Sequence, residues 1–262
     1  MDNLHNIVSI KSIMAEKILI YGAGAIGRGF LAPIFSAMGY SIYFVDKNSK
    51  IINELKSRNY YKTAFSNHGN YEIVNVKYEK AFLLGEEDDM LEEADIVFSC
   101  VGPNNIGEFA SKLKKCKAIV SFENERESVD NLKNMSGNPN CYFGIPDVIS
   151  SNDCPQNLKE KDGLCLVSEM GQIAIEKGNF IFPKSINTYS KKELEKYWNC
   201  KFYLHNTPHA AAAFLGKIFG VKYIHEAMSV PFINATLSSI MESTKKAMKL
   251  SSVKKVILQF ME

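Results

Sequence analysis

Short apolar segments alternate with helix-like segments in the first half of the chain, and this alternation constrains the fold more than any other feature. The apolar segments are rich in β-branched and aromatic residues and occupy residues 17–21, 41–46, 94–100 and 118–122. The segments between them, residues 25–39, 48–59 and 104–116, space their apolar side chains as helices do. Buried strands that alternate with helices form a parallel sheet with right-handed crossovers. The sequence therefore predicts an α/β fold with a Rossmann-like, mostly parallel sheet.

The second half of the chain has a different pattern. A polar, turn-rich stretch over residues 149–163 reads as a connection, and short strands are predicted at 164–170 and 179–183. Ser190 and Glu193 have the spacing of a capping box, which predicts a helix that runs through Trp198. From that point onward helices dominate, with an interruption at Pro231. The sequence thus predicts a mainly helical second domain.

Two domains follow from these patterns. We predict a dinucleotide-binding Rossmann domain over residues 15–150 and a mainly helical substrate and catalytic domain over residues 151–262. Residues 71–84 add a further strand or a hairpin to the first domain.

Composition excludes several classes of partner. The 262 residues carry a formal net charge of +2, with 46% hydrophobic and 23% charged residues, so neither nucleic acid nor a membrane surface is favoured. No apolar run is long enough to span a bilayer, and the first residues do not resemble a signal peptide. The six cysteines form no CxxC pair, which predicts reduced thiols and no metal site. We expect a cytoplasmic protein with a small-molecule partner and leave its oligomeric state open.

A glycine-rich turn follows the first predicted strand. Gly22, Gly24 and Gly27 fit the pattern GxGxxG, with a strand before it and a helix after it, as dinucleotide binding requires. The first glycine permits the tight turn, the second lets a pyrophosphate approach the backbone, and the third lets the helix pack closely on the strand. The candidate cofactor-binding residues here are Gly22, Gly24, Ala25, Ile26, Gly27 and Arg28.

Asp46 ends the second predicted strand about twenty residues after this motif, where a carboxylate binds the adenosine ribose hydroxyls. A carboxylate at that point repels a 2′-phosphate, so NAD is favoured over NADP, although Lys47 next to it weakens this preference. The alternative is that Asp46 caps the following helix, which is compatible with either cofactor.

Gly102 lies in a second close turn, after the strand over residues 94–100. Because that turn is at the carboxyl edge of the sheet, Gly102 is a candidate for cofactor binding. The alternative is an ordinary turn in which Asn104 caps the next helix.

Lys201, Asn206 and His209 form a polar cluster with the spacing K-x4-N-x2-H. Thr207 and Pro208 have the character of a helix N-cap and first helical residue, which would place His209 in the first turn and Lys201 at the end of a short strand. The positive end of a helix dipole would keep His209 neutral and lower the pKa of Lys201, as suits a general base. On spacing alone, a structural role is the more common one, because a lone histidine at a helix start is usually a structural residue and a lysine is usually solvated.

Several motifs together resemble the polyol-specific long-chain dehydrogenases. They are GAGAIGRGF, FVD, SCVGPNN, SFENERES and KFYLHNTPHAAAAFLGK, and they occur in the order of that family. The resemblance implies an NAD-dependent, metal-free oxidoreductase that transfers hydride between a ketose phosphate and a polyol phosphate, such as fructose 6-phosphate and D-mannitol 1-phosphate. It also implies that Lys201 is the general base, that Asn206 binds the reacting oxygen, and that His209 positions substrate and lysine.

The resemblance further assigns Asn124 to the oxyanion pocket, although Asn124 could instead cap the helix that follows it. Val148 stands where the family usually carries an arginine, and the chain is shorter than expected. These departures leave two alternatives open: a related hexuronate or other ketose reductase, and a truncated, non-catalytic NAD-binding relative.

Overall fold

The computed structural model describes residues 17–67, 70–151, 154–178 and 186–248. The chain divides into two compact units, Met1–Thr188 and Tyr189–Glu262. The strand predicted over residues 179–183 lies outside the described residues.

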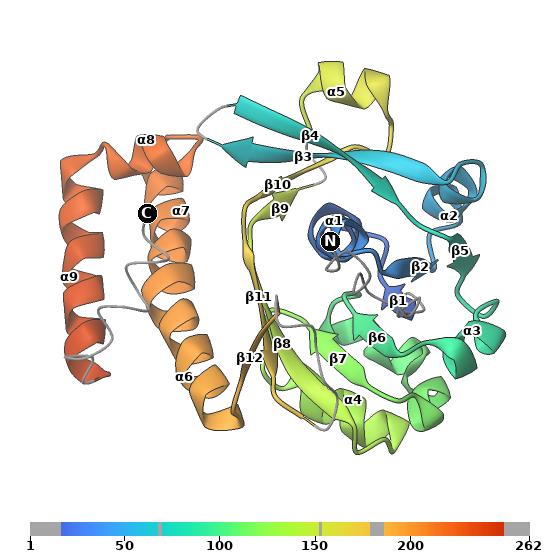
Figure 1. Ribbon diagram of the computed structural model, residues 1–262. Coiled ribbons are helices and arrows are strands. Elements are labelled where there is room, and N and C mark those ends of the chain that lie inside the picture. Colours follow the sequence, from blue (N-terminus) through green and yellow to red (C-terminus); the bar gives the residue numbers. More distant parts are fainter. Residues whose placement is uncertain (1–16, 68–69, 152–153, 179–185, 249–262) are drawn as a thin grey trace, which may run out of the picture. The chain divides into compact units, whose positions relative to one another are not determined.

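The first unit is built on an eight-stranded sheet (Figure 1), in the order β12-β11-β8-β7-β6-β1-β2-β5. Its strands are β1 (Lys17–Tyr21), β2 (Ser41–Asp46), β5 (Lys80–Leu83), β6 (Ile96–Ser99), β7 (Ile119–Phe122), β8 (Cys141–Asp147), β11 (Gln172–Glu176) and β12 (Asn187–Tyr189). From β5 to β8 neighbouring strands are parallel, whereas β11 is antiparallel to β8. The predicted Rossmann-like sheet is thereby confirmed.

The strand order reverses direction beside β1. Tyr21, the last residue of β1, pairs with Val45 of β2 on one side and with Ser99 of β6 on the other. The chain passes from β1 to β2 on one side and later returns to β6 on the other, which opens a crevice beyond the carboxyl ends of the strands. Ligands of doubly wound sheets bind in this crevice.

Helices of the first unit connect these strands. They are η1 (Gly27–Leu31), α1 (Ala32–Ala37), α2 (Ser49–Lys56), α3 (Asp88–Glu93), η2 (Pro103–Glu108), η3 (Ala110–Lys115), α4 (Ser128–Ser136) and α5 (Gln156–Lys161). The segment 104–116 forms two short 3₁₀ helices rather than one α-helix, because Phe109 between them leaves the helical region at φ −137°. The core lies against the sheet, where Ile18, Ile20, Phe44 and Phe98 are fully buried.

A second, four-stranded sheet covers the helix that follows the glycine-rich turn (Figure 1), in the order β4-β3-β10-β9. Its strands are β3 (Tyr60–Asn67), β4 (Asn70–Lys77), β9 (Ser150–Ser151) and β10 (Leu166–Glu169). The helix approaches so closely that a Cβ at Gly29 would lie 2.6 Å from Ser150 Oγ. The first unit extends to residue 188, beyond the predicted domain boundary at residue 150. The reason is that β10 and β11, which follow residue 150, pair with strands of the first unit.

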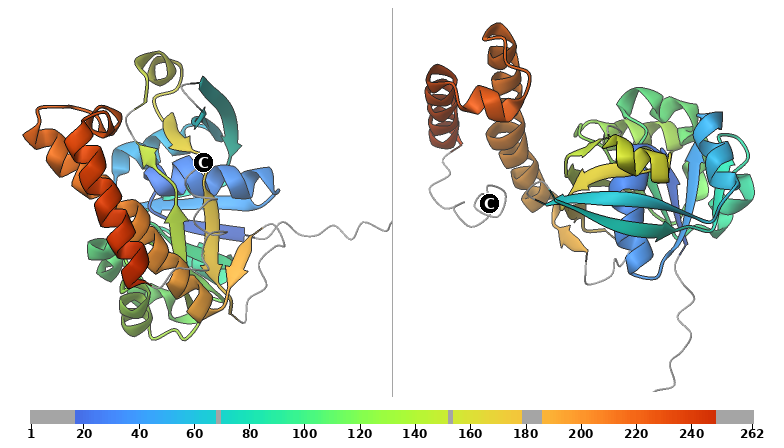
Figure 2. Two further views of the ribbon diagram at one scale, coloured as in Figure 1. Left: turned by 90° about the vertical axis from the view of Figure 1, so that its left-hand side faces the viewer. Right: turned by 90° about the horizontal axis from the view of Figure 1, so that it is seen from above.

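The second unit is helical, as the sequence predicted. It contains α6 (Lys191–Lys201), η4 (Phe202–Asn206), α7 (Thr207–Ile218), α8 (Ile224–Met228) and α9 (Pro231–Ala247). The first three join end to end into one rod, and α9 runs beside it (Figure 2). The predicted capping box at Ser190 and Glu193 is present, and α9 begins at Pro231. Within the described residues, no helix is both long and apolar enough to cross a membrane.

Candidate active site

Gly22 makes the sharp turn at the end of β1. It has φ +100°, its N–H donates to Val45 O at 2.8 Å, and a Cβ there would overlap the carbonyl oxygen of Cys100. A Cβ at Gly27 would likewise overlap the carbonyl oxygen of Gly22, so this glycine lets the helix pack on the turn. A Cβ at Gly24, in contrast, would have no atom within 4 Å. Two glycines are therefore required by packing, and the third leaves open space beside the backbone.

Asp46 joins the end of β2 to this turn. Its Oδ2 accepts a hydrogen bond from Ala23 N at 2.7 Å, and its Oδ1 accepts one from Asn48 N at 2.8 Å. The cap of α2 is Asn48, whose Oδ1 accepts from Lys50 N and Ile51 N. The alternative reading of Asp46 as that helix cap is therefore wrong. Each carboxylate oxygen of Asp46 has a lone pair left for a ligand hydroxyl.

A cleft opens at the carboxyl ends of β1, β2 and β6. Of the predicted cofactor residues, Gly22, Gly24 and Asp46 line it. The other lining residues are Tyr21, Lys47, Leu84, Cys100, Val101, Asn105, Glu108 and Phe109. The ring of Tyr21 stacks on that of Phe109, with 4.1 Å between centroids. The cleft thus combines an open backbone turn, a carboxylate and apolar walls, which suits a nucleotide.

Gly102 is held in its turn by a buried carboxylate that the sequence reasoning missed. Gly102 has φ +84°, and its N–H donates to Glu123 Oε1 at 3.0 Å. Ser99 Oγ lies 3.4 Å from the same oxygen. Burial raises the pKa of Glu123 to about 7, against the lowering effect of these hydrogen bonds. The sequence did offer one indication of this contact: Glu123 directly follows β7, and β7 lies beside β6, the strand that leads into the Gly102 turn.

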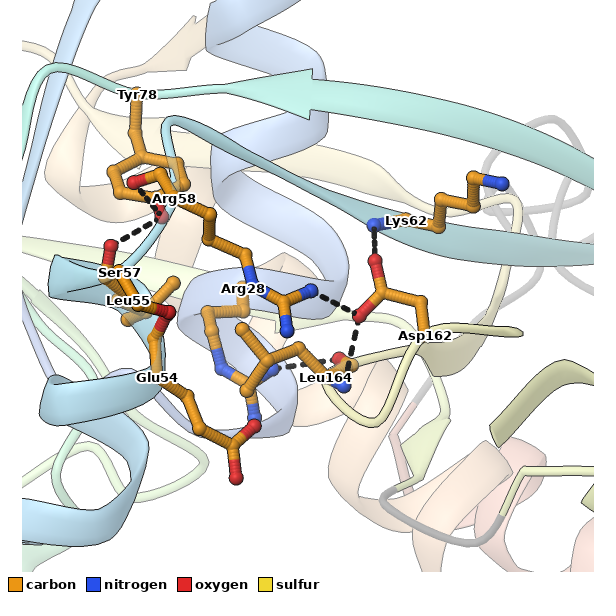
Figure 3. A network of polar contacts seen from close by, with 9 residues as sticks. All are labelled: Arg28, Glu54, Leu55, Ser57, Arg58, Lys62, Tyr78, Asp162 and Leu164. Carbon is orange, nitrogen blue, oxygen red and sulfur yellow. Dashed lines mark hydrogen bonds and ion pairs between the residues drawn. The ribbon is translucent and has the colours of Figure 1, made fainter. Parts of the chain in front are cut away.

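Arg28 lies away from the cleft, in a polar network beneath the second sheet (Figure 3). Its side chain is buried, its Nε donates to Ala23 O, and its Nη1 donates to Leu164 O at 2.7 Å. Burial lowers the pKa of this guanidinium. Arg28 therefore ties the glycine-rich turn to the loop before β10, and a direct contact of Arg28 with a cofactor stays a prediction.

Asp162 anchors the same network (Figure 3). Its Oδ1 accepts from Arg58 Nη1 at 2.9 Å and from Leu164 N at 3.0 Å, and its Oδ2 accepts from Lys62 N at 2.8 Å. Tyr78 OH donates nearby to Leu55 O at 2.7 Å. Through Lys62 these bonds connect β3 to the loop before β10, and Leu164 of that loop accepts the hydrogen bond from Arg28.

Lys201, Asn206 and His209 lie on one continuous helical segment of the second unit. Lys201 is the last residue of α6, not the end of a strand, and the chain passes through the π-helical turn η4 directly into α7. A π turn stacks residues five apart, so Asn206 follows Lys201 on the same side, and His209 lies three residues further on that face. The ring of His205 contacts that of His209, with 4.4 Å between centroids.

The α-helix α7 begins at Thr207, but the predicted N-cap role of Thr207 is wrong, because η4 leads into α7 without a break in helical geometry. Thr207 has helical dihedral angles, and its Oγ1 donates to Phe202 O at 2.9 Å instead of capping a helix. Pro208 fits here because the wider π turn precedes it. Its missing N–H falls at the point where the backbone hydrogen bonds change from the π-helical to the α-helical pattern, so no regular helical hydrogen bond is lost. No helix N-terminus stands at this point of the described chain, so the dipole argument for His209 and Lys201 does not apply.

Asn124 lies in the first unit, in a bend after β7, and its side chain is exposed. The following helix, α4, begins at Ser128 after the N-cap residue Glu127, so Asn124 is not its cap. The cleft and Asn124 belong to one unit, and the Lys201 helix belongs to the other.

The cleft fits the dinucleotide that the sequence predicts. Gly24 leaves room for a pyrophosphate against the backbone, the helix that begins there offers its N–H groups, and Asp46 keeps lone pairs for ribose hydroxyls. The strand order places this cleft at the switch point of a doubly wound sheet. The first unit is therefore a Rossmann-type dinucleotide-binding domain.

Comparison with known proteins identifies the family. Residues 16–135 match the mannitol dehydrogenase Rossmann domain, and residues 193–260 match the mannitol dehydrogenase C-terminal domain. The chain belongs to the mannitol dehydrogenase family. A mannitol-1-phosphate 5-dehydrogenase of Thermoanaerobacter pseudethanolicus is 29% identical in an alignment 259 positions long, which covers 88% of this chain and 66% of that protein. The enzyme of the same name from Enterococcus faecalis is 29% identical, over 86% of this chain and 65% of its own length.

The chain thus spans just under two thirds of the length of these curated relatives. Among solved structures, D-mandelate dehydrogenase with NADH and anilino(oxo)acetate has a TM-score of 0.60 at 15% identity, and covers 93% of this chain and 77% of its own. A probable 2-dehydropantoate 2-reductase from Bacillus subtilis has a TM-score of 0.58 at 14% identity, over 93% of this chain and 80% of its own. At these identities the likeness concerns the fold.

Proposed function

We propose that the chain is an NAD-dependent polyol-phosphate dehydrogenase that interconverts fructose 6-phosphate and D-mannitol 1-phosphate. The observation that carries this proposal is the position of Lys201, Asn206 and His209 on one continuous helical segment, in a family whose relatives include mannitol-1-phosphate 5-dehydrogenases. The Rossmann cleft of the first unit supports it independently.

The cofactor would be held by the glycine-rich turn and Asp46. The backbone of Gly22, Gly24, Ala25 and Ile26 would face the pyrophosphate, with Gly27 holding the helix close. Asp46 would accept hydrogen bonds from the adenosine ribose hydroxyls and repel a 2′-phosphate, which favours NAD. Gly102 would border the other end of the cofactor, in a turn fixed by Glu123.

Bound NAD supplies the hydride acceptor for the carbinol carbon of the polyol phosphate. Lys201 would take the proton from the reacting hydroxyl, and Asn206 would donate a hydrogen bond to its oxygen as negative charge develops. His209 orients the substrate and the lysine. The spacing of Lys201, Asn206 and His209 across the π turn η4 supports these roles, because π turns occur frequently at functional sites.

The test follows NADH oxidation with fructose 6-phosphate, fructose and fructuronate in turn, for the wild type, Lys201→Ala and the control Lys196→Ala. Lys196 is an exposed lysine on the same helix, α6. We expect turnover of fructose 6-phosphate, a loss of at least about a hundredfold in kcat for Lys201→Ala, and wild-type turnover for the control. NADH binding, measured by fluorescence, should be equal in all three.

Other outcomes point to other functions. Turnover that survives Lys201→Ala would refute the assigned base. Preference for fructuronate would favour the hexuronate reductase alternative, for which the observation is Val148: this side chain packs against the main core where the family usually has an arginine. NADH binding without turnover of any ketose would identify a non-catalytic relative.

A further inference from the structure

Lys47 follows Asp46 at the mouth of the cleft, where its charge would be expected to attract NADP. In doubly wound folds a carboxylate at the end of the second strand selects NAD, whereas a cationic side chain beside it accommodates the 2′-phosphate of NADP. The chain carries both in succession. Which of them decides selectivity therefore depends on where the Lys47 ammonium is held.

The Lys47 ammonium is bound by groups on η2. Its Nζ lies 2.7 Å from Glu108 Oε1 and 2.9 Å from Asn105 Oδ1. Asn105 is itself fixed, because its Nδ2 donates to Val101 O at 2.6 Å. Lys47, Asn105 and Glu108 all line the cleft with Asp46. The ion pair therefore spans from the end of β2 to the segment after β6, beside the carboxylate that would read the ribose.

This arrangement changes the charge that a ligand meets. A 2′-phosphate next to Asp46 would meet the carboxylates of Asp46 and Glu108. The Lys47 ammonium would not be available to it, because Glu108 and the side-chain oxygen of Asn105 already bind that ammonium. Recruiting Lys47 to the phosphate would leave Glu108 without its cation. The side chains of Lys47 and Glu108 are 57% and 40% exposed, so salt screens the pair and the effect on affinity is moderate.

We propose that Glu108 is a cofactor-specificity residue: it holds Lys47 away from the ribose, and so withholds from the 2′-phosphate of NADP the only cationic side chain among the described residues that line the cleft. The proposal rests on the dinucleotide binding in the proposed function and adds a second selectivity element to Asp46. Neither residue of the pair has a part in the proton transfer assigned to Lys201.

The experiment titrates NADH and NADPH by fluorescence into the wild type, Glu108→Gln, Lys47→Met and the double variant Glu108→Gln/Lys47→Met. The control is Glu93→Gln, which removes the carboxylate of the exposed Lys17–Glu93 pair at the opposite end of β1. Competition with adenosine 2′,5′-bisphosphate against 5′-AMP isolates the adenosine half of the site. No turnover is needed for any of these measurements.

We expect Glu108→Gln to lower the Kd for NADPH about tenfold, because a charge-assisted contact to the phosphate becomes available, and to leave the Kd for NADH within about twofold. The gain should disappear in the double variant and at high salt. Lys47→Met should bind NADPH no more tightly than the wild type does, because Glu108 is then left without its cation, and Glu93→Gln should bind both dinucleotides as the wild type does.

Three results would overturn the proposal. An unchanged Kd for NADPH in Glu108→Gln would show that the pair does not set selectivity, while the NADH binding of the proposed function would stand. A gain that persists in the double variant would assign the effect to repulsion by Glu108 rather than to Lys47. Absence of binding of both dinucleotides would refute the proposed function together with this inference.

Discussion

The carboxylate of Asp46 accepts a hydrogen bond from the backbone N–H of Ala23, with 2.7 Å between Oδ2 and the nitrogen. This bond fastens the group that would read the adenosine ribose to the turn that would hold the pyrophosphate. The two recognition elements of the cofactor therefore form one rigid structure, and a change at Asp46 disturbs both.

Asp46→Ala should weaken NADH binding at least about tenfold, since hydrogen bonds to charged groups contribute about 1.5–3 kcal/mol each. It should also destabilise the fold, because Ala23 N–H and Asn48 N–H lose their acceptor. Fluorescence titration and urea unfolding measure the two effects. Asn48→Ala is the matched control: it removes the cap of α2, costs about 1 kcal/mol, and should leave NADH affinity unchanged.

Gly22 and Gly24 should respond oppositely to the same substitution. Gly24→Ala should fold normally, since its Cβ meets no atom within 4 Å, and yet should weaken NADH binding at least about tenfold by filling the space beside the backbone. Gly22→Ala should destabilise the protein by about 2 kcal/mol or more, because of its positive φ and the overlap with Cys100 O. Thermal unfolding with parallel titration separates them; equal Tm losses would contradict the assignment.

Glu123 should make stability fall as pH rises. Burial raises its folded-state pKa to about 7, above the ordinary 4.5 of the unfolded chain, so the folded state holds the proton more tightly. Its contribution is therefore fully present below about pH 4.5 and is lost as pH rises through 7, by about 3 kcal/mol in total. Urea unfolding at several pH values should show this slope in the wild type and not in Glu123→Gln, which retains an oxygen acceptor for Gly102 N–H. A parallel slope in both would refute it.

Asp162 should matter for stability more than any exposed ion pair. Asp162→Ala leaves Lys62 N–H and Leu164 N–H without their acceptor and Arg58 without its carboxylate, at a site where Asp162 is 5% exposed. We expect a loss of about 3–5 kcal/mol in the free energy of unfolding. Glu86→Gln, which breaks the exposed Lys56–Glu86 pair, should lower the free energy of unfolding far less, because solvent screens that pair. Similar costs for both variants would contradict the structural role given to the network.

Sequence patterns predicted the structure correctly where a few neighbouring residues determine the backbone conformation. The strands 17–21 and 41–46 were predicted to the residue, because a buried parallel strand needs a continuous apolar run whatever lies around it. The Gly22 turn followed for the same reason, since its conformation suits glycine alone. Thr207 and Pro208 misled because the same residue types that start a helix also fit inside one when a π turn precedes them.

The residues around the cleft required the fold. Glu108, Asn105 and Lys47 are separated by up to 61 positions along the chain, and nothing in the spacing of η2 indicates that its carboxylate meets the lysine after β2. Glu123 and Gly102 meet only because β6 and β7 are neighbours in register.

The sequence by itself therefore determined the alternation of strands and helices in the main sheet, the glycine-rich turn and the acidic residue at the end of β2, because hydrophobic periodicity and glycine stereochemistry act over a few neighbouring residues. The tertiary structure alone decided the second sheet, the buried Arg28 network, the continuity of the helix through Lys201 and the partner of Lys47. Each of these depends on the burial and pairing of groups distant in the chain, and their free energy arises only when the strands and helices have packed together.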